Sequence, residues 1–184
     1  MGIKSYFSFC VLFIYSLNIS ADINDYKYPF STPSFSNYGT LGLINMPNAR
    51  FYDAGTLAFS LKKMNPYTRG SLVAYPFNWL EATYAYTDIS NVLYSDNFNF
   101  SGNQSYKDKG FSTKLKLATE TYNFPAIALG MRDIGGTGIF SSEFLVASKK
   151  FYNIDITLGA AWGTMSNKRY SNPLFYGKNI FFKP

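Results

Sequence analysis

Acidic side chains are the residues of this sequence with the clearest capacity for acid–base chemistry. Two carboxylates on either side of a glycosidic bond can hydrolyse it, and the chain has 11 Asp and Glu residues. The candidates are Asp53, Glu81, Asp88, Asp96, Asp108, Asp133, Glu143 and Asp155. They are scattered among expected turns and strands, and no spacing indicates that two of them converge. Capping of turns and contact with solvent explain them better than catalysis.

Other catalytic groups are missing from the sequence. The chain has no histidine, which removes the usual general base, a common zinc ligand and any Ser-His pair. Its one cysteine, Cys10, lies in the N-terminal apolar run, so the mature chain would carry no thiol. The stretch DIGGTG (133–138) lacks the Lys and the helix of a phosphate-binding loop, and a hairpin turn explains its glycines. We expect no enzyme activity, no cofactor and no metal site.

The basic charge of the chain does not indicate a nucleic-acid partner. The net charge is +6, and Lys107, Lys109, Lys114 and Lys116 lie close together in the sequence. Lys114 and Lys116 fall on the polar face of an expected strand, and an exported chain does not meet nucleic acid. We expect no nucleic-acid partner.

The N-terminus, MGIKSYFSFCVLFIYSLNISAD, has the layout of a secretory signal peptide. Lys4 precedes an apolar run over 7–17, which is shorter than the ~20 residues of a membrane-spanning helix. An N-terminal anchor helix is the alternative. Cys10 comes too early, and with the wrong neighbours, for a lipoprotein motif.

The sequence divides into three expected regions. Residues 1–21 are the expected signal peptide, and 22–38, rich in Pro, Ser, Asn and Tyr, are an expected irregular lead-in on the periplasmic side. Residues 39–184 are expected to form the N-terminal part of a β-barrel domain.

Strict alternation of side-chain type is the main structural signal. In NIDITLGAAW (153–162), Ile154, Ile156, Leu158 and Trp162 alternate with small or polar residues, which places the two sets on opposite faces of a strand. Segments with the same character lie at 56–62, 71–75, 79–87, 111–117, 126–132 and 139–148. In 139–148 the pattern puts Phe144 and Val146 opposite Glu143, although the two faces of 71–75 and 139–148 could be exchanged.

These segments predict an all-β fold, an antiparallel up-and-down transmembrane β-barrel. The chain is 47% hydrophobic and 20% aromatic, yet its mean hydropathy is only −0.10, as expected where half of each strand faces a polar lumen. The connection 88–110 is long and polar and is expected outside the cell, whereas other turns are short. A secreted sandwich is the alternative, but its surface would carry more than 15% charged residues.

The alternation also assigns side chains to the two surfaces of the barrel. Lumen-lining positions are expected for Lys62, Glu81, Lys114, Lys116, Arg132, Glu143 and Asp155. Cross-strand pairing among these charges, which would simply fill the interior, is as good an explanation as transport. Aromatic residues expected at the membrane interface are Trp79, Tyr84, Tyr86, Tyr152 and Trp162, with Tyr75 near them.

Several stretches together resemble the YjbH family of bacterial envelope proteins. The most distinctive are GLINMPNARFYDAGT (42–56) and YPFNWLEATYAYTD (75–88), and the resemblance covers most of the mature chain. It implies an outer-membrane β-barrel tied to exopolysaccharide or capsule production and export, in the outer membrane of a Gram-negative cell. It implies no catalytic motif.

Members of that family are much longer, so we interpret this chain as an N-terminal fragment whose strands leave two open sheet edges. The leading hypothesis is a barrel that assists exopolysaccharide export or assembly. Its expected partners are outer-membrane lipid, exopolysaccharide and other envelope export or assembly proteins. The alternatives are a non-transporting structural or surface-interaction protein and a general porin.

Overall fold

The computed structural model describes residues 34–166. The chain divides into two compact units, Met1–Phe30 and Ser31–Pro184, and every described residue belongs to the second. The expected signal peptide over 1–21, most of the lead-in over 22–38 and the stretch 167–184 lie outside the described residues.

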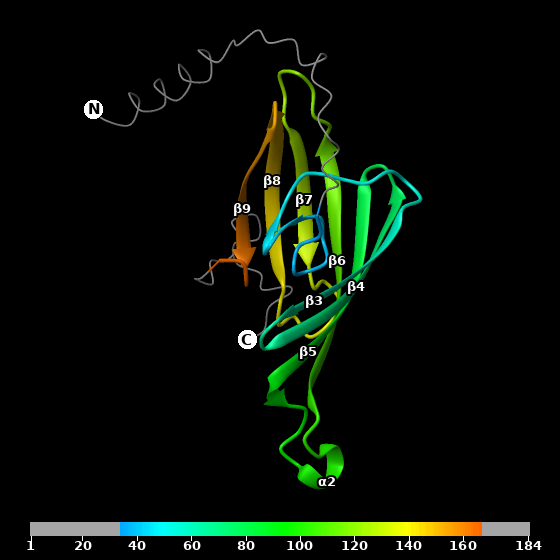
Figure 1. Cartoon of the computed structure of the whole chain (residues 1–184), viewed down its shortest axis with the longest axis vertical. Coiled ribbons are helices and arrows are strands. Elements are labelled where there is room, and N and C mark those ends of the chain that lie inside the picture. Colours follow the sequence, from blue (N-terminus) through cyan, green and yellow to red (C-terminus); the bar gives the residue numbers. More distant parts are fainter. Residues whose placement is uncertain (1–33, 167–184) are drawn as a thin grey trace, which may run out of the picture. The chain divides into compact units, whose positions relative to one another are not determined.

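Seven strands form one antiparallel sheet in which each strand pairs with its neighbours in the sequence (Figure 1). They are β3 (Leu57–Met64), β4 (Tyr67–Phe77), β5 (Leu80–Leu93), β6 (Ser105–Ala118), β7 (Ala126–Arg132), β8 (Ser142–Phe151) and β9 (Ile154–Gly163). The sheet curls into a half-barrel. The prediction of an all-β, antiparallel, up-and-down arrangement is therefore confirmed.

Three small elements complete the described part. β1 (Gly42–Leu43) and β2 (Met46–Pro47) pair with each other as a separate hairpin. One helical turn, α2 (Phe98–Ser101), lies between β5 and β6. No helix in residues 34–166 is long and apolar enough to cross a membrane.

The two ends of the sheet differ in their connections. At one end, called here the helix end, lie the β3–β4 turn, the β5–β6 loop that carries α2, and the β7–β8 loop. At the other, the turn end, lie the β4–β5 turn, the β6–β7 loop and the β8–β9 turn. Strands β5 and β6 project beyond their neighbours toward α2 (Figure 1). They include much of 88–110, which the sequence had indicated was a loop.

The sheet has an inverted distribution of polar and apolar side chains. Its outer face carries exposed Leu and Phe side chains, such as Phe59 at 71% and Leu158 at 73% exposure. Its inner face buries charged groups, and Glu81 and Lys114 are both 0% exposed. Soluble proteins rarely bury such charges or display so many large apolar side chains.

Residues 34–52, named here the inner segment, cover the inner face. Leu41 packs with Val73 and Tyr75 of β4 in one buried cluster. Ala49 packs with a second cluster from β7 and β8, formed by Ala126, Ala128, Phe144 and Val146. The core of this unit therefore lies between the inner segment and the sheet.

A glycine in β7 makes room for a buried aromatic ring of β8. Gly130 of β7 is opposite Phe144 of β8, and a Cβ atom at Gly130 would lie 2.1 Å from the Phe144 ring. The ring thus lies across the bare backbone of its partner strand, which only glycine allows.

The register corrects two assignments made from alternation. Glu143 pairs with Met131 and Trp162 on the outer face, whereas Phe144 and Val146 lie on the inner face. Tyr75 is buried on the inner face and does not lie in an interfacial ring. In both strands the inner segment supplies an apolar environment on the face expected to be polar.

Candidate functional site on the inner face

A fully buried ion pair lies at the centre of the inner face. Lys114 of β6 and Glu81 of β5 are cross-strand partners, with Lys114 Nζ 2.8 Å from Glu81 Oε2. The Tyr75 hydroxyl donates to the same carboxylate oxygen at 2.8 Å. Lys114 Nζ also donates to the Arg50 carbonyl at 2.9 Å and lies 4.6 Å from the centre of the Phe51 ring. The pair therefore joins three elements: β4 through Tyr75, the β5–β6 ladder and the inner segment.

Two arginines hold the first part of the inner segment. The guanidinium groups of Arg69 and Arg132 both lie over the Tyr38 ring, at 4.5 Å and 4.2 Å from its centre. Arg69 donates to the Asn37 carbonyl at 2.9 Å, and Arg132 donates to the Asn45 carbonyl at 3.1 Å. Ring stacking and backbone hydrogen bonds together offset part of the cost of burying these two cations.

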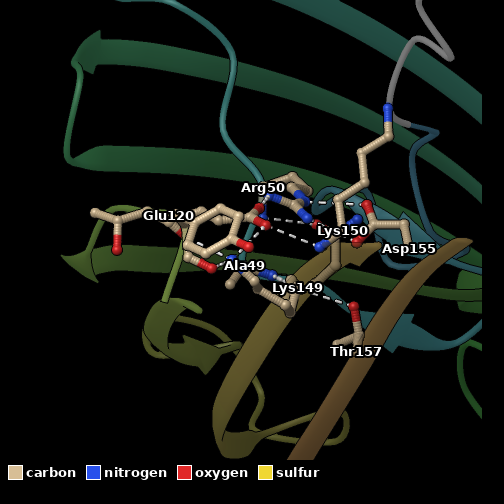
Figure 2. Close-up of polar contacts among 11 residues, drawn as sticks. Ala49, Arg50, Glu120, Lys149, Lys150, Asp155 and Thr157 are labelled. Atoms are coloured by element: carbon tan, nitrogen blue, oxygen red, sulfur yellow. Dashed lines mark hydrogen bonds and ion pairs between the residues drawn. The ribbon is translucent and has the colours of Figure 1, made fainter. Parts of the chain in front are cut away.

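Arg50 holds the last part of the segment through two carboxylates (Figure 2). Its Nε and Nη2 donate to the two oxygens of Asp155 on β9, at 3.0 Å and 2.7 Å, which is a bidentate arrangement. Its Nη1 pairs with Glu120 of the β6–β7 loop. Glu120 also accepts from the Lys150 amide at 2.8 Å and lies 3.4 Å from Lys149 Nζ.

The surroundings of Glu120 favour its charged form. Burial by itself would raise its pKa, but the Lys150 amide and the cations of Arg50 and Lys149 outweigh burial and lower the pKa below its usual value. Glu120 is therefore a carboxylate at neutral pH, and Arg50 remains held between two negative charges.

The described inner face is an arrangement for holding a segment in place. Its cations bind carbonyl oxygens and an aromatic ring of the same chain, and its carboxylates bind cations. No group of three or more Asp, Glu, Cys or His side chains within residues 34–166 could hold a metal ion.

The chain is similar to known proteins of one family. The model of the YjbH family, described as "Exopolysaccharide biosynthesis protein YbjH", matches residues 34–182. This chain belongs to the YjbH family. A relative from Escherichia coli strain K12, named "Uncharacterized lipoprotein YjbH", is 42% identical over 166 residues. The match covers 89% of this YjbH-family chain and 24% of the relative, so the chain spans about a quarter of that protein's length. No solved structure matches it.

The register places the charged residues singled out from the YjbH sequence. Six of them lie on the inner face: Lys62, Glu81, Lys114, Lys116, Arg132 and Asp155. The structure brings Glu81 and Lys114 into direct contact, whereas Arg132 and Asp155 each bind the inner segment. Glu143 lies on the outer face.

The aromatic residues expected at the membrane interface lie at different heights along the sheet. Trp79 is in the β4–β5 turn, stacked on Phe77 with 5.4 Å between ring centres, and Tyr152 is in the β8–β9 turn. On the outer face of β5, Tyr84 lies in the middle of the sheet, opposite Leu72, and Tyr86 lies two residues nearer the helix end. Trp162 lies near the end of β9.

Several of the residues that bind the inner segment were not predicted from the YjbH sequence. Tyr38, Arg50, Arg69 and Glu120 were not selected, and 34–38 was assigned to an irregular lead-in. Arg69 could have been found by extending the alternation of 71–75 backward, since Arg69, Ser71 and Val73 share one face. No local pattern relates Arg50 to Asp155, which lies 105 residues away.

Proposed function

We propose that this chain forms part of an outer-membrane β-barrel that assists the export or assembly of exopolysaccharide. The observation that carries the proposal is the inverted sheet, with exposed Leu and Phe side chains outside and buried charges inside. In water the outer face would be costly, whereas in lipid it is the stable arrangement.

The outer face changes from apolar to charged residues toward the helix end, as expected for strands that pass out of the hydrocarbon layer of a membrane. On β6, Leu117, Leu115 and Phe111 are followed toward the helix end by Lys109 and Lys107 on the same face. On β3, Leu57, Phe59 and Leu61 are followed by Lys63. Such a change from apolar to charged residues is typical of strands that leave the hydrocarbon region.

The family supports the link to polysaccharide. The family description refers to exopolysaccharide biosynthesis, and the E. coli relative is named a lipoprotein, which favours a place in the cell envelope. We propose a non-enzymatic role in the outer membrane, with lipid, exopolysaccharide and other envelope export or assembly proteins as partners.

A closed barrel requires further strands. Within the described residues, β3 and β9 each pair on one side only, and lipid cannot satisfy the free backbone groups of an open edge. We propose that strands of the full-length protein outside residues 34–166 pair with β3 and β9.

The inner segment favours assisted export over general diffusion. A general porin keeps a water-filled interior, whereas here Glu81 and Lys114 are sealed beneath residues 34–52. Passage of a polymer would require the segment to move or to lie beside the path.

The test is deletion of the complete gene, with measurement of polysaccharide released and retained at the cell surface. We expect both amounts to fall, and the intact gene to restore them. Unchanged polysaccharide would contradict the proposal. Solute leakage through the purified full-length protein in vesicles would instead favour a general porin, and loss of surface attachment alone would favour a surface-interaction protein.

A further inference from the structure

A cleft lies at the helix end of the described unit, away from the inner segment. It is formed by the far part of β5, the first part of β6, the α2 loop and the β7–β8 loop, and its volume is about 580 Å³. Its lining includes three aromatic residues, Tyr86, Tyr94 and Phe100, and three polar residues, Lys107, Lys109 and Gln104.

The aromatic rings are held in place although they are exposed. Phe100, on α2, is 74% exposed, and its ring centre is 6.4 Å from that of Tyr94, with the two planes 26° apart. The Tyr94 amide donates to the Gln104 carbonyl at 2.8 Å and closes the base of the loop. The Asn97 side chain caps the first turn of α2 by accepting from the Asn99 amide. The loop therefore presents flat apolar surfaces to solvent in a fixed arrangement.

The charge of the cleft is positive. Lys107 pairs with Asp88 at 3.0 Å, so its charge is partly neutralised. Lys109 makes no ion pair or hydrogen bond with any described residue, and no carboxylate lines the cleft. An incoming anion would therefore find an ammonium group that the described part of the chain does not neutralise.

We propose that this cleft binds an anionic glycan, in which carboxylate-bearing sugar rings stack on the aromatic side chains. Pyranose rings present flat C–H surfaces that pack on aromatic faces, and their hydroxyl groups can bond to an amide such as that of Gln104. A sugar carboxylate would accept a charge-assisted hydrogen bond from Lys109. Rings outnumber free cations here, which favours a sugar chain over the phosphates of a lipid headgroup. This inference rests on the proposed function, because it assigns the exported polymer a negative charge.

The experiment measures binding of oligogalacturonate to the full-length protein in detergent by titration calorimetry, with a dextran oligomer of similar length as the neutral probe. We expect oligogalacturonate to bind and dextran to bind at least tenfold more weakly. Phe100→Ala should weaken binding by about fivefold through loss of stacking. Lys109→Ala should weaken it by about tenfold through loss of a charged hydrogen bond.

Phe98→Ala is the matched control. Phe98 lies on the same helical turn and is 68% exposed, but it does not line the cleft. Its removal should leave affinity within about twofold, because isolated surface changes have small effects. Equal weakening by Phe98→Ala and Phe100→Ala would overturn the assignment to the cleft.

Two further results would overturn the proposal: equal binding of dextran and oligogalacturonate, or binding of purified lipopolysaccharide without binding of oligogalacturonate. These experiments distinguish a failure of the cleft assignment from a failure of the proposed export role. If gene deletion abolishes polysaccharide output but oligogalacturonate does not bind, the cleft assignment fails alone. If the cleft binds oligogalacturonate while deletion leaves output unchanged, the export role fails alone.

Discussion

Among single residues, Lys114 is expected to have a large effect on stability. It is fully buried and neutralises Glu81, which the Tyr75 hydroxyl also contacts. Removing one partner of a buried pair leaves an uncompensated charge, at a cost of about 3–5 kcal/mol. We expect Lys114→Met to lower the free energy of unfolding of the full-length protein by that amount, as measured by urea titration in vesicles.

The partner substitution provides the control for this prediction. Adding Glu81→Leu to Lys114→Met removes both charges, and we expect it to recover most of the lost stability. Lys62→Met, on the same face but without an ion pair among the described residues, should change stability by less than about 0.5 kcal/mol. Additive losses in the double variant would contradict the pairing.

Asp133 gives a prediction that depends on pH. It begins the β7–β8 loop with φ of 52°, accepts from the Phe140 amide at 3.1 Å, and its Oδ1 is buried without a partner among the described residues. Burial raises its pKa above the usual 3.8. The folded state therefore holds the proton more tightly, and ionisation lowers stability as pH rises through that window.

Asp133→Asn should remove this penalty. Asparagine tolerates positive φ, so we expect the free energy of unfolding at pH 7 to rise by about 1 kcal/mol, with no gain below pH 3.8, the usual pKa of aspartate. Thermal unfolding of the full-length protein at both pH values measures the difference. A gain of equal size at both pH values would show that the charge is not its cause.

For single residues, the alternation in the sequence predicted the correct face of the sheet for Glu81, Lys114 and Asp155, but not for Glu143. In β8 the inner residues Phe144 and Val146 are apolar because Ala49 and Phe51 cover them. An apolar residue that faces lipid and one that faces the inner segment have the same side-chain type. The face could therefore not be chosen from local sequence.

Among the elements, the inner segment is held at its Arg50 end by ion pairs, so its attachment to the sheet is expected to depend on pH. The lowered pKa of Glu120 means that its contribution to stability is present above the usual value of 4.5 and is lost as pH falls through the folded-state pKa. We expect the opening of residues 34–52, measured as amide hydrogen exchange in the full-length protein relative to the intrinsic exchange rate at each pH, to increase by about three- to tenfold below that pKa, because partly exposed ion pairs contribute about 1 kcal/mol.

Glu120→Gln should raise exchange relative to the intrinsic rate at pH 7, and should remove most of the further rise of this ratio in acid. Asp53→Asn, close in sequence but outside the Arg50 network, is the matched control and should preserve the behaviour of the wild type. If Glu120→Gln exchanges like the wild type at every pH, the ion pairs do not hold the segment.

The existence and order of the strands were predictable, whereas their lengths were not. All seven alternating segments correspond to strands, because period-two patterning reflects a sheet with two different environments. β5 and β6 extend to Leu93 and Ser105, and the pairing of the two strands changes register between Ile89 and Leu93, so strict alternation is lost there. The hairpin continues there through backbone pairing, for which side-chain pattern gives no signal.

For the whole molecule, the proposed membrane environment can be tested with one charge. Leu72 lies in the middle of the outer face, opposite Phe59 and Tyr84 on the neighbouring strands. In a bilayer, Leu72→Arg should cost about 2–4 kcal/mol of folding free energy, whereas Thr68→Arg, nearer the helix end of the same strand and face, should cost about 0–1 kcal/mol.

Refolding of full-length variants into lipid vesicles, followed by urea titration, measures both values. Equal costs at the two positions would contradict a depth-dependent lipid environment. A Leu72→Arg variant that is as stable as the wild type, and more soluble without lipid, would indicate a water-exposed face.

The order of contacts along the inner segment has a consequence for the timing of assembly. Asn37 binds Arg69 of β4, Asn45 binds Arg132 of β7, Ala49 binds Ser148 of β8 and Arg50 binds Asp155 of β9. The separation between partners grows from 32 to 105 residues along this series. Contacts between distant residues form slowly because long loops must close first. We therefore expect the inner segment to bind the sheet step by step, beginning at Asn37. The contact between Arg50 and Asp155 is expected to form last, once β9 has joined the sheet.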